Sequence, residues 1–201
     1  FVGTVELLYN RNLNAVHYYN ANLENPIGTF AGVDKRAKYA GTDAGVRVND
    51  NVSMGAVLTN AQGAYHKSAT FKLEYPYQKG LWGSIAYTVA DSKDYMSAGS
   101  IASGSWTGAR SVNGNNDLSL SNSDFLSPNR LVGLLGYRLE YGGNYGGATS
   151  FTLGYVGNQG NPFSYTISGD MNGDRINGNE LIFIPAQMSD IRFQPLVVGT
   201  R

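Results

Sequence analysis

From Ser68 to Tyr75 the chain reads SATFKLEY, a strict alternation of polar and apolar side chains. The odd positions carry alanine, phenylalanine, leucine and tyrosine, whereas the even ones carry serine, threonine, lysine and glutamate. Because successive side chains of a β-strand point to opposite faces, this stretch predicts a strand with one apolar and one polar face. Residues 76–80 form a turn sequence, and the alternation resumes over residues 84–89. The sequence therefore predicts a β-hairpin with a short connection.

The same pattern recurs further along the chain. The odd positions from Leu131 to Tyr141 are apolar or glycine, and Arg138 and Glu140 lie at even positions. A glycine-rich turn at residues 142–147 leads into a second alternating arm. The patterns together predict five long strands, at residues 2–19, 51–77, 81–95, 130–141 and 149–168. Several exceed the roughly 9–11 residues that a strand needs to cross a bilayer.

Short turns alternate with long connections in this chain. Polar segments, rich in Ser, Asn and Gly, occupy about residues 21–50, 91–129 and 157–190. Loops longer than about 12–15 residues are uncommon in compact soluble domains, but outer-membrane barrels combine tight periplasmic turns with long extracellular loops. We therefore expect an all-β fold, a segment of a large antiparallel transmembrane β-barrel with long extracellular loops. A soluble β-sandwich is the alternative.

Single residues and short segments predict a bend in one strand and the positions of several aromatic side chains. Residues 60–63 are expected to form a bulge or bend in the second strand. Tyrosines near strand ends, such as Tyr75 and Tyr137, fit an interfacial girdle, to which we also assign Trp82. Trp106 lies in the longest polar loop, where it either stacks on a ligand or anchors the loop to its neighbours.

Composition narrows the function classes. The chain has 201 residues, no cysteine and a formal net charge of zero. No window approaches the roughly 18 consecutive apolar residues of a membrane helix, which excludes a helical membrane protein. The lack of cysteine excludes a disulfide framework and a thiolate metal site. The neutral charge argues against a nucleic-acid partner.

We expect the sequence to be part of a longer chain. Its first nine residues read as a strand interior, and residues 196–201 do not read as a natural chain end. Barrels begin near eight strands, and an unpaired backbone group in hydrocarbon costs several kcal/mol, so five strands need others to close the sheet. Residues 1–201 are thus expected to form part of a single outer-membrane β-barrel domain whose plug and terminal strands are absent.

Several motifs, in this order along most of the chain, resemble one family. They are LTNAQGAY at residues 58–65, KLEYP at 72–76, GSIAYTVADSKD at 83–94, SVNGNN at 111–116, PNR at 128–130, GDMNGD at 169–174 and NELIFIP at 179–185. Together they resemble the late barrel of TonB-dependent outer-membrane receptors. Within that family, the closest resemblance is to the Oar-like receptors, which are similar to transporters bearing a carboxypeptidase-regulatory domain.

The resemblance implies a large barrel around an N-terminal plug, in the outer membrane of a Gram-negative bacterium. Such receptors import scarce nutrients with energy delivered by TonB. Outer-membrane lipid would be the immediate partner, and TonB would act through a plug that this sequence lacks. Peptide, glycan, siderophore and vitamin all stay open as substrates, as does a surface lipoprotein partner. The sequence also leaves open a different class, a cell-surface β-rich binding or adhesion module with a calcium-stabilised loop.

Catalytic motifs do not emerge from the sequence, so we do not expect an enzyme. The histidines, His17 and His66, form no HExxH pattern. The sequence contains no G-x-S-x-G elbow.

One motif suggests a metal site. Asp170, Asn172 and Asp174 alternate as do the first ligands of a calcium loop, and Glu180 is a further candidate ligand. The match is partial, because Arg175 occupies the glycine position and Glu180 falls one place early for the bidentate ligand. Calcium is the only cofactor that the sequence suggests, and a loop stabilised by Asx turns without metal is the alternative.

Overall fold

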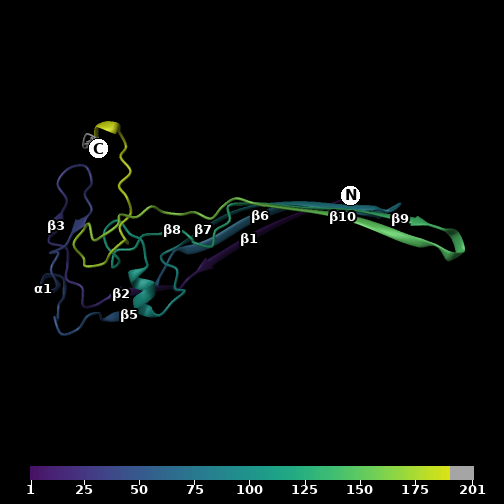
Figure 1. Ribbon diagram of the computed structural model, residues 1–201. Coiled ribbons are helices and arrows are strands. Elements are labelled where there is room, and N and C mark those ends of the chain that lie inside the picture. Colours follow the sequence, from purple (N-terminus) through teal and green to yellow (C-terminus); the bar gives the residue numbers. More distant parts are fainter. Residues whose placement is uncertain (191–201) are drawn as a thin grey trace, which may run out of the picture. The chain divides into compact units, whose positions relative to one another are not determined.

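The computed structural model describes residues 1–190, except the side chain of Asn144, and has an all-β fold of antiparallel strands with little helix (Figure 1). The expectation for residues 196–201 lies outside this part. The strands are β1 (Val2–Asn12), β2 (Ala15–Asn20), β3 (Gly28–Thr29), β4 (Ala37–Lys38), β5 (Ala56–Ala61), β6 (Ala64–Gln78), β7 (Leu81–Asp94), β8 (Ser121–Asn122), β9 (Asn129–Tyr141) and β10 (Gly147–Asn158). The helices are α1 (Asp43–Val46) and α2 (Ala102–Thr107), with 3₁₀ turns η1 (Gly143–Tyr145) and η2 (Met188–Asp190). No helix among these residues is long and apolar enough to cross a membrane.

The chain divides into two compact units. The first, here the sheet unit, comprises residues 1–17, 58–101 and 119–163. The second, here the loop unit, comprises residues 18–57, 102–118 and, among the described residues, 164–190. The three long polar segments supply most of the loop unit, so these connections fold together rather than extending separately into solvent.

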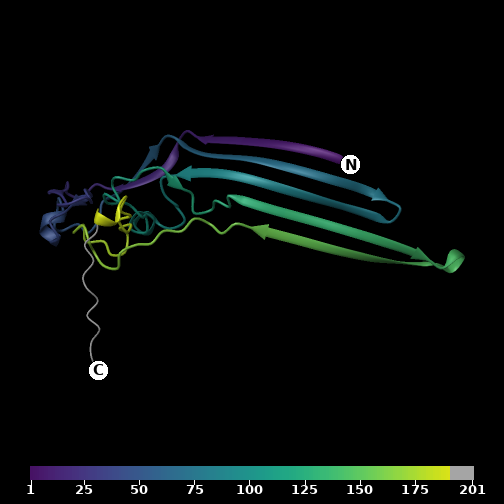
Figure 2. The same cartoon turned by 90° about the horizontal axis from the view of Figure 1, so that it is seen from above.

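The sheet unit is an antiparallel meander. Its strand order is β1-β6-β7-β9-β10, with the short β8 paired to β7, and the long strands lie side by side in this order in Figure 2. The five predicted strands are therefore present and pair in sequence order. The sheet is open, because neither β1 nor β10 pairs with a further strand along its outer edge within residues 1–190.

The strand register places the alternating positions on common faces. Phe71 lies opposite Val5 on β1 and Tyr87 on β7. Further across the sheet, Leu135 lies opposite Leu153 on β10. Since directly paired residues point to the same face of a sheet, the apolar positions of all five strands form one face. The alternation in sequence thus predicts the facing of the whole sheet.

The predicted strand ends differ from the observed ones in three places. The first predicted strand divides into β1 and β2 at Leu13 and Asn14. The second divides into β5 and β6 at Gln62 and Gly63, which confirms the predicted bend; Gly63 has a φ of 104°, a left-handed conformation that favours glycine. The last strand ends at Asn158 rather than residue 168, because Gly160 and Pro162 follow it and interrupt a ladder.

The first hairpin turns through a tight two-residue connection. Gln78 pairs with Leu81, and between them Lys79 and Gly80 have φ values of 50° and 88°. Two successive positive φ angles are characteristic of the type I′ turn, whose twist matches that of the flanking strands. The turn therefore sets the pairing of Gln78 with Leu81, and an irregularity between Tyr75 and Gln78 shifts the register before the long ladder of β6 and β7 begins.

The loop unit has a core that is largely polar. Val46 and Tyr39 are buried in it, but so are many amides and charged groups. Trp106 is buried too, and its indole Nε1 donates to Asn116 Oδ1 at 2.9 Å. Of the two roles expected for this side chain, the structure supports the anchoring of its loop. Hydrogen bonding replaces apolar packing as the main organising interaction of this unit.

Candidate functional site

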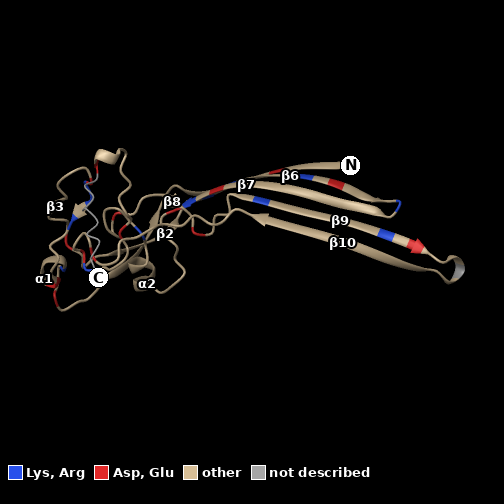
Figure 3. Ribbon diagram, turned by 45° about the horizontal axis from the view of Figure 1, so that its top comes forward, with Lys and Arg blue, Asp and Glu red and all other residues tan. Residues whose placement is uncertain are grey.

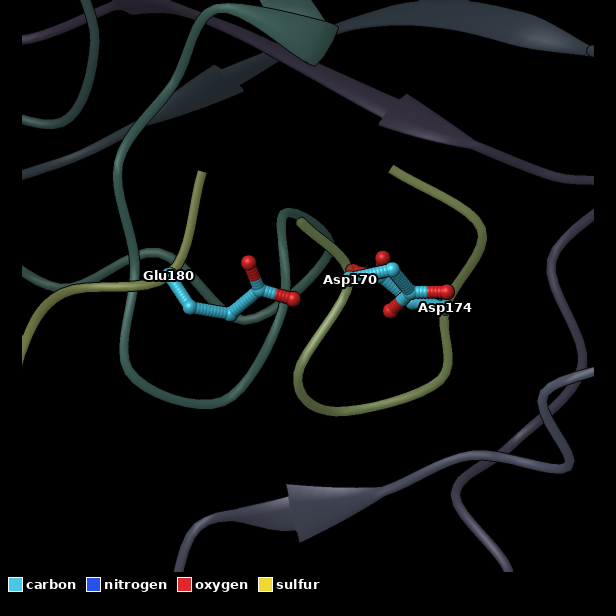
Figure 4. A group of neighbouring side chains, drawn as sticks. All are labelled: Asp170, Asp174 and Glu180. Atoms are coloured by element: carbon cyan, nitrogen blue, oxygen red, sulfur yellow. The ribbon is translucent and has the colours of Figure 1, made fainter. Parts of the chain in front are cut away.

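The three predicted acidic ligands come together in the loop unit. Asp170, Asp174 and Glu180 each offer a carboxylate oxygen, and these oxygens all lie within 4.8 Å of one another. Figure 4 shows Glu180 pointing toward the two aspartates from a separate stretch of chain. We call this group the carboxylate cluster. It is buried, since Asp174 and Glu180 are only 2% and 0% exposed.

Asx-type hydrogen bonds give the 170–176 loop its shape. Asp170 accepts from the backbone N–H of Gly173 at 2.7 Å and from that of Arg175 at 2.9 Å. Asn172 Oδ1 accepts from the N–H of Asp174 at 2.9 Å. Such bonds curl the chain so that the side chains at alternate positions converge. The Asx-turn interpretation is therefore correct for the backbone, and it places the same side chains where a cation would need them.

Arg175 resolves one mismatch with a calcium loop. It has a φ of 67°, the left-handed conformation for which that position of the loop normally uses glycine. Its side chain turns away and pairs with Asp43 at 2.7 Å. The position thus has the required backbone geometry although the residue is unusual for it.

Glu180 reaches the cluster through a strand-like segment. It forms an isolated parallel bridge with Ser111, and its carbonyl accepts from the N–H of Ile167 at 2.9 Å. The N–H of Leu181 donates to the carbonyl of Ser111 at 3.0 Å. Backbone pairing on both sides therefore holds Glu180 in place. This pairing brings its carboxylate to the cluster, although Glu180 stands one residue early for the last ligand of a calcium loop.

Two further amides belong to the site, although sequence reasoning did not identify them. Asn115 and Asn179 are 0% and 2% exposed. The Asn115 amide nitrogen donates to the carbonyl of Trp106 at 2.6 Å, which directs its oxygen toward Ser111 and Asn179. The density of asparagine in residues 113–116 and the Asn-Glu pair at 179–180 were the available signals.

The cluster has no basic counterpart within the described chain. None of the ion pairs formed by residues 1–190 joins a lysine or arginine to Asp170, Asp174 or Glu180. Burial raises the pKa of the Asp174 carboxyl and that of Glu180 above their ordinary values. Burial, together with the charge of Asp174, raises the pKa of Tyr39 to about 12. Burial thus disfavours the charged forms of these acids, and the neighbouring carboxylates add to this effect.

The sheet unit presents a second candidate site, its apolar face. Large side chains on this face stay exposed, among them Phe71 at 52%, Leu135 at 53% and Leu153 at 70%. Charged residues occupy few positions of the long strands, as Figure 3 shows. Exposed apolar patches that exceed a few hundred Å² mark sites of interaction with protein or membrane. We call this surface the apolar face.

The opposite face of the sheet is polar. Thr70 and Thr88 share a hydrogen bond of 2.9 Å across β6 and β7, and Lys72 pairs with Glu74 at 2.5 Å. Trp82 lies on this face as well, because it pairs with Gly136 at an even position. The register points its indole across Gly136, so Trp82 does not share a face with Tyr75 and Tyr137, the tyrosines that suggested the interfacial girdle.

The two histidines do not form a site. His17 stacks on Tyr95 with ring centroids 6.0 Å apart. His66 lies on β6, where its register partner on β7 is Ser92. Neither belongs to the group of metal-ligating side chains found among residues 1–190.

No family model, curated protein or solved structure matches this chain.

Proposed function

We propose that the chain is a barrel segment of a TonB-dependent transporter in the outer membrane of a Gram-negative bacterium, and that the transporter imports a scarce nutrient. The observation that carries this proposal is the apolar face, which extends across five paired strands and stays exposed. Lipid is the partner that such a continuous, nearly uncharged surface fits. The transporter class, the plug and TonB come from the motif resemblance.

The strand lengths support a membrane-spanning role. β9 has 13 residues and β10 has 12. At about 3.4 Å per residue and a tilt of about 40°, strands of this length rise about 30 Å along a barrel axis. That exceeds the roughly 25 Å apolar band of outer-membrane barrels, so each strand is long enough to cross.

The open edges of the sheet also fit a barrel. A spanning sheet needs every backbone N–H and C=O paired, because water is absent from hydrocarbon. The outer edges of β1 and β10 offer unpaired backbone groups within the described residues. In the proposed protein, further strands complete these edges. The polar face, which carries Lys72 and Arg138, then lines the barrel interior.

Neighbouring residues on β10 provide a test at matched depth. Leu153 lies on the apolar face and Thr152 on the polar face. Residues 1–201 contain no cysteine, so L153C and T152C variants of the full-length protein, with any cysteine elsewhere replaced by serine, can each carry one environment-sensitive fluorophore. We expect lipid-borne quenchers to reduce the fluorescence at position 153 in membranes, and water-soluble quenchers to act mainly at position 152.

Two results would overturn the proposal. The first is equal quenching of both positions by the water-soluble reagent. The second is a full-length protein that remains monomeric in water without detergent. Either result would favour the cell-surface binding module instead.

A further inference from the structure

The Asn179 side chain is surrounded by oxygen atoms. In one orientation its amide nitrogen donates to Asn115 Oδ1 at 3.2 Å and to Asp174 Oδ2 at 3.3 Å. Its amide oxygen then faces Glu180 Oε2 at 2.8 Å and the carbonyl oxygen of Ile176 at 3.2 Å, and both of these are acceptors. A buried oxygen without a donor destabilises the folded protein.

Rotating the Asn179 amide by half a turn exchanges its nitrogen and oxygen, but the oxygen still has no donor. The nitrogen then donates to Glu180 and Ile176, but the oxygen faces Asn115 Oδ1 and Asp174 Oδ2. Asn115 cannot become a donor there without losing the 2.6 Å bond from its nitrogen to the carbonyl of Trp106. Both orientations leave a buried oxygen facing only oxygens. While these carboxyls are ionised, the centre therefore has more acceptors than donors, which points to a bound cation.

We infer that Asp170, Asp174 and Glu180, together with the amide oxygen of Asn179, bind a calcium ion. This inference is independent of the proposed transport function. It stands on two observations, the convergence of three carboxylates and the unpartnered Asn179 oxygen. The carbonyl of Ile176 is a further oxygen within reach of the same position.

The ligand chemistry selects the ion. All the candidate ligands are carboxylate, amide or carbonyl oxygens, which suit hard cations rather than zinc or copper. Calcium–oxygen distances of about 2.3–2.6 Å put ligands on opposite sides of the ion about 4.6–5.2 Å apart, whereas those of magnesium lie about 4.0–4.2 Å apart. The carboxylate oxygens all lie within 4.8 Å of one another, which leaves room for calcium; the weaker effect that we expect of magnesium tests the choice of ion.

The ion would join separate parts of the loop unit. The carbonyl of Asn172 accepts from the N–H of Tyr39 at 2.7 Å, and that of Gly173 accepts from Gly41 at 3.0 Å. Asn179 reaches Asn115 at 3.2 Å. Calcium at the carboxylate cluster would thus stabilise contacts among three chain segments that are distant in sequence.

The test uses the full-length protein in detergent. We expect calcium to bind with a one-to-one stoichiometry in calorimetry, to raise the melting temperature and to protect the loop unit from proteolysis, with a weaker effect of magnesium. E180Q keeps the side-chain shape but removes a charge, so calcium affinity should fall about tenfold or more. E24Q is the matched control, because Glu24 is exposed in the same unit, and it should bind calcium as the wild type does.

Two outcomes would refute the inference. One is identical melting of the wild-type protein with calcium and with chelator, without heat of binding. The other is unchanged calcium affinity in folded E180Q. If circular dichroism shows that E180Q does not fold, D170N takes its place, since Asp170 is partly exposed, and the wild-type titration alone still decides whether calcium binds.

Discussion

The contact between Trp82 and Gly136 offers the sharpest test of the sheet. These residues pair across β7 and β9. A Cβ atom added to Gly136 would lie 2.1 Å from Cε2 and 2.4 Å from Nε1 of the Trp82 indole. Side-chain carbons do not approach to such distances, so in G136A the indole must rotate away or the strands must separate.

The expected cost follows from the packing. Overpacking of this kind destabilises proteins by about 1–3 kcal/mol, which is about a five- to 150-fold change in the folding equilibrium. The φ angle of Gly136 is not positive, so backbone strain adds nothing to this figure. G154A is the matched control on β10, since the nearest atom to its added Cβ, Leu134 Cδ1, is 3.9 Å away. There, alanine should be neutral or stabilising, by up to about 1 kcal/mol.

Unfolding in urea, followed by the gel mobility of the full-length protein refolded into lipid vesicles, measures both variants. A double-mutant cycle with W82A isolates the contact, because G136A should cost little once the indole is gone. The reasoning fails if G136A is as stable as G154A, or if W82A does not relieve the loss.

Two other substitutions test the facing of the sheet and its first turn. L135R should reduce the folding free energy in vesicles by about 2–4 kcal/mol, the cost of arginine near the bilayer midplane, whereas L134R on the opposite face should cost much less; equal refolding yields would contradict the facing. G80A should destabilise the first hairpin by more than about 1 kcal/mol, because Gly80 has a φ of 88° and an added Cβ would lie 2.4 Å from the Arg138 carbonyl oxygen. Urea unfolding midpoints that match the wild type would show that this turn does not hold the register.

The sheet was predictable because its signal is local. Alternation over SATFKLEY and the turn after it are properties of adjacent residues, and they determine which side chains share a face. What the sequence did not show was the break after Asn12, where β1 ends and its partner strand β6 begins at Ala64. That break depends on pairing between distant segments. Trp82 was grouped with the strand-end tyrosines because it opens a strand after a short turn, but its even position places it on the polar face.

The loop unit was harder to predict because its core is polar. Apolar periodicity is the main sequence signal of a buried segment, and segments whose buried residues are Asn115, Asn172 and Asn179 lack it. The polar composition of these segments instead predicts loops exposed to solvent. The aspartates and Glu180 were predicted as ligands because metal-ligand spacing is a local pattern. Asn115 comes from a segment brought to the site only by folding, whereas Asn179 lies beside Glu180 in the sequence and belongs to no ligand spacing that would single it out.

The two units depend on different physical conditions. Strand pairing stabilises the sheet unit, but its apolar face contributes to stability only when it is removed from water. The stability of this unit therefore depends on what covers that face. The loop unit buries few large apolar side chains and relies on hydrogen bonds, each of which contributes about 0.5–1.5 kcal/mol in net terms. A buried group of carboxylates subtracts from that stability unless a positive charge offsets it. Since no lysine or arginine within the described chain pairs with these carboxylates, a bound divalent cation would offset the burial of ionised Glu180. We therefore expect lipid to stabilise the sheet unit, whose apolar face is exposed, and calcium to stabilise the loop unit, whose carboxylate cluster lacks a positive partner among residues 1–190.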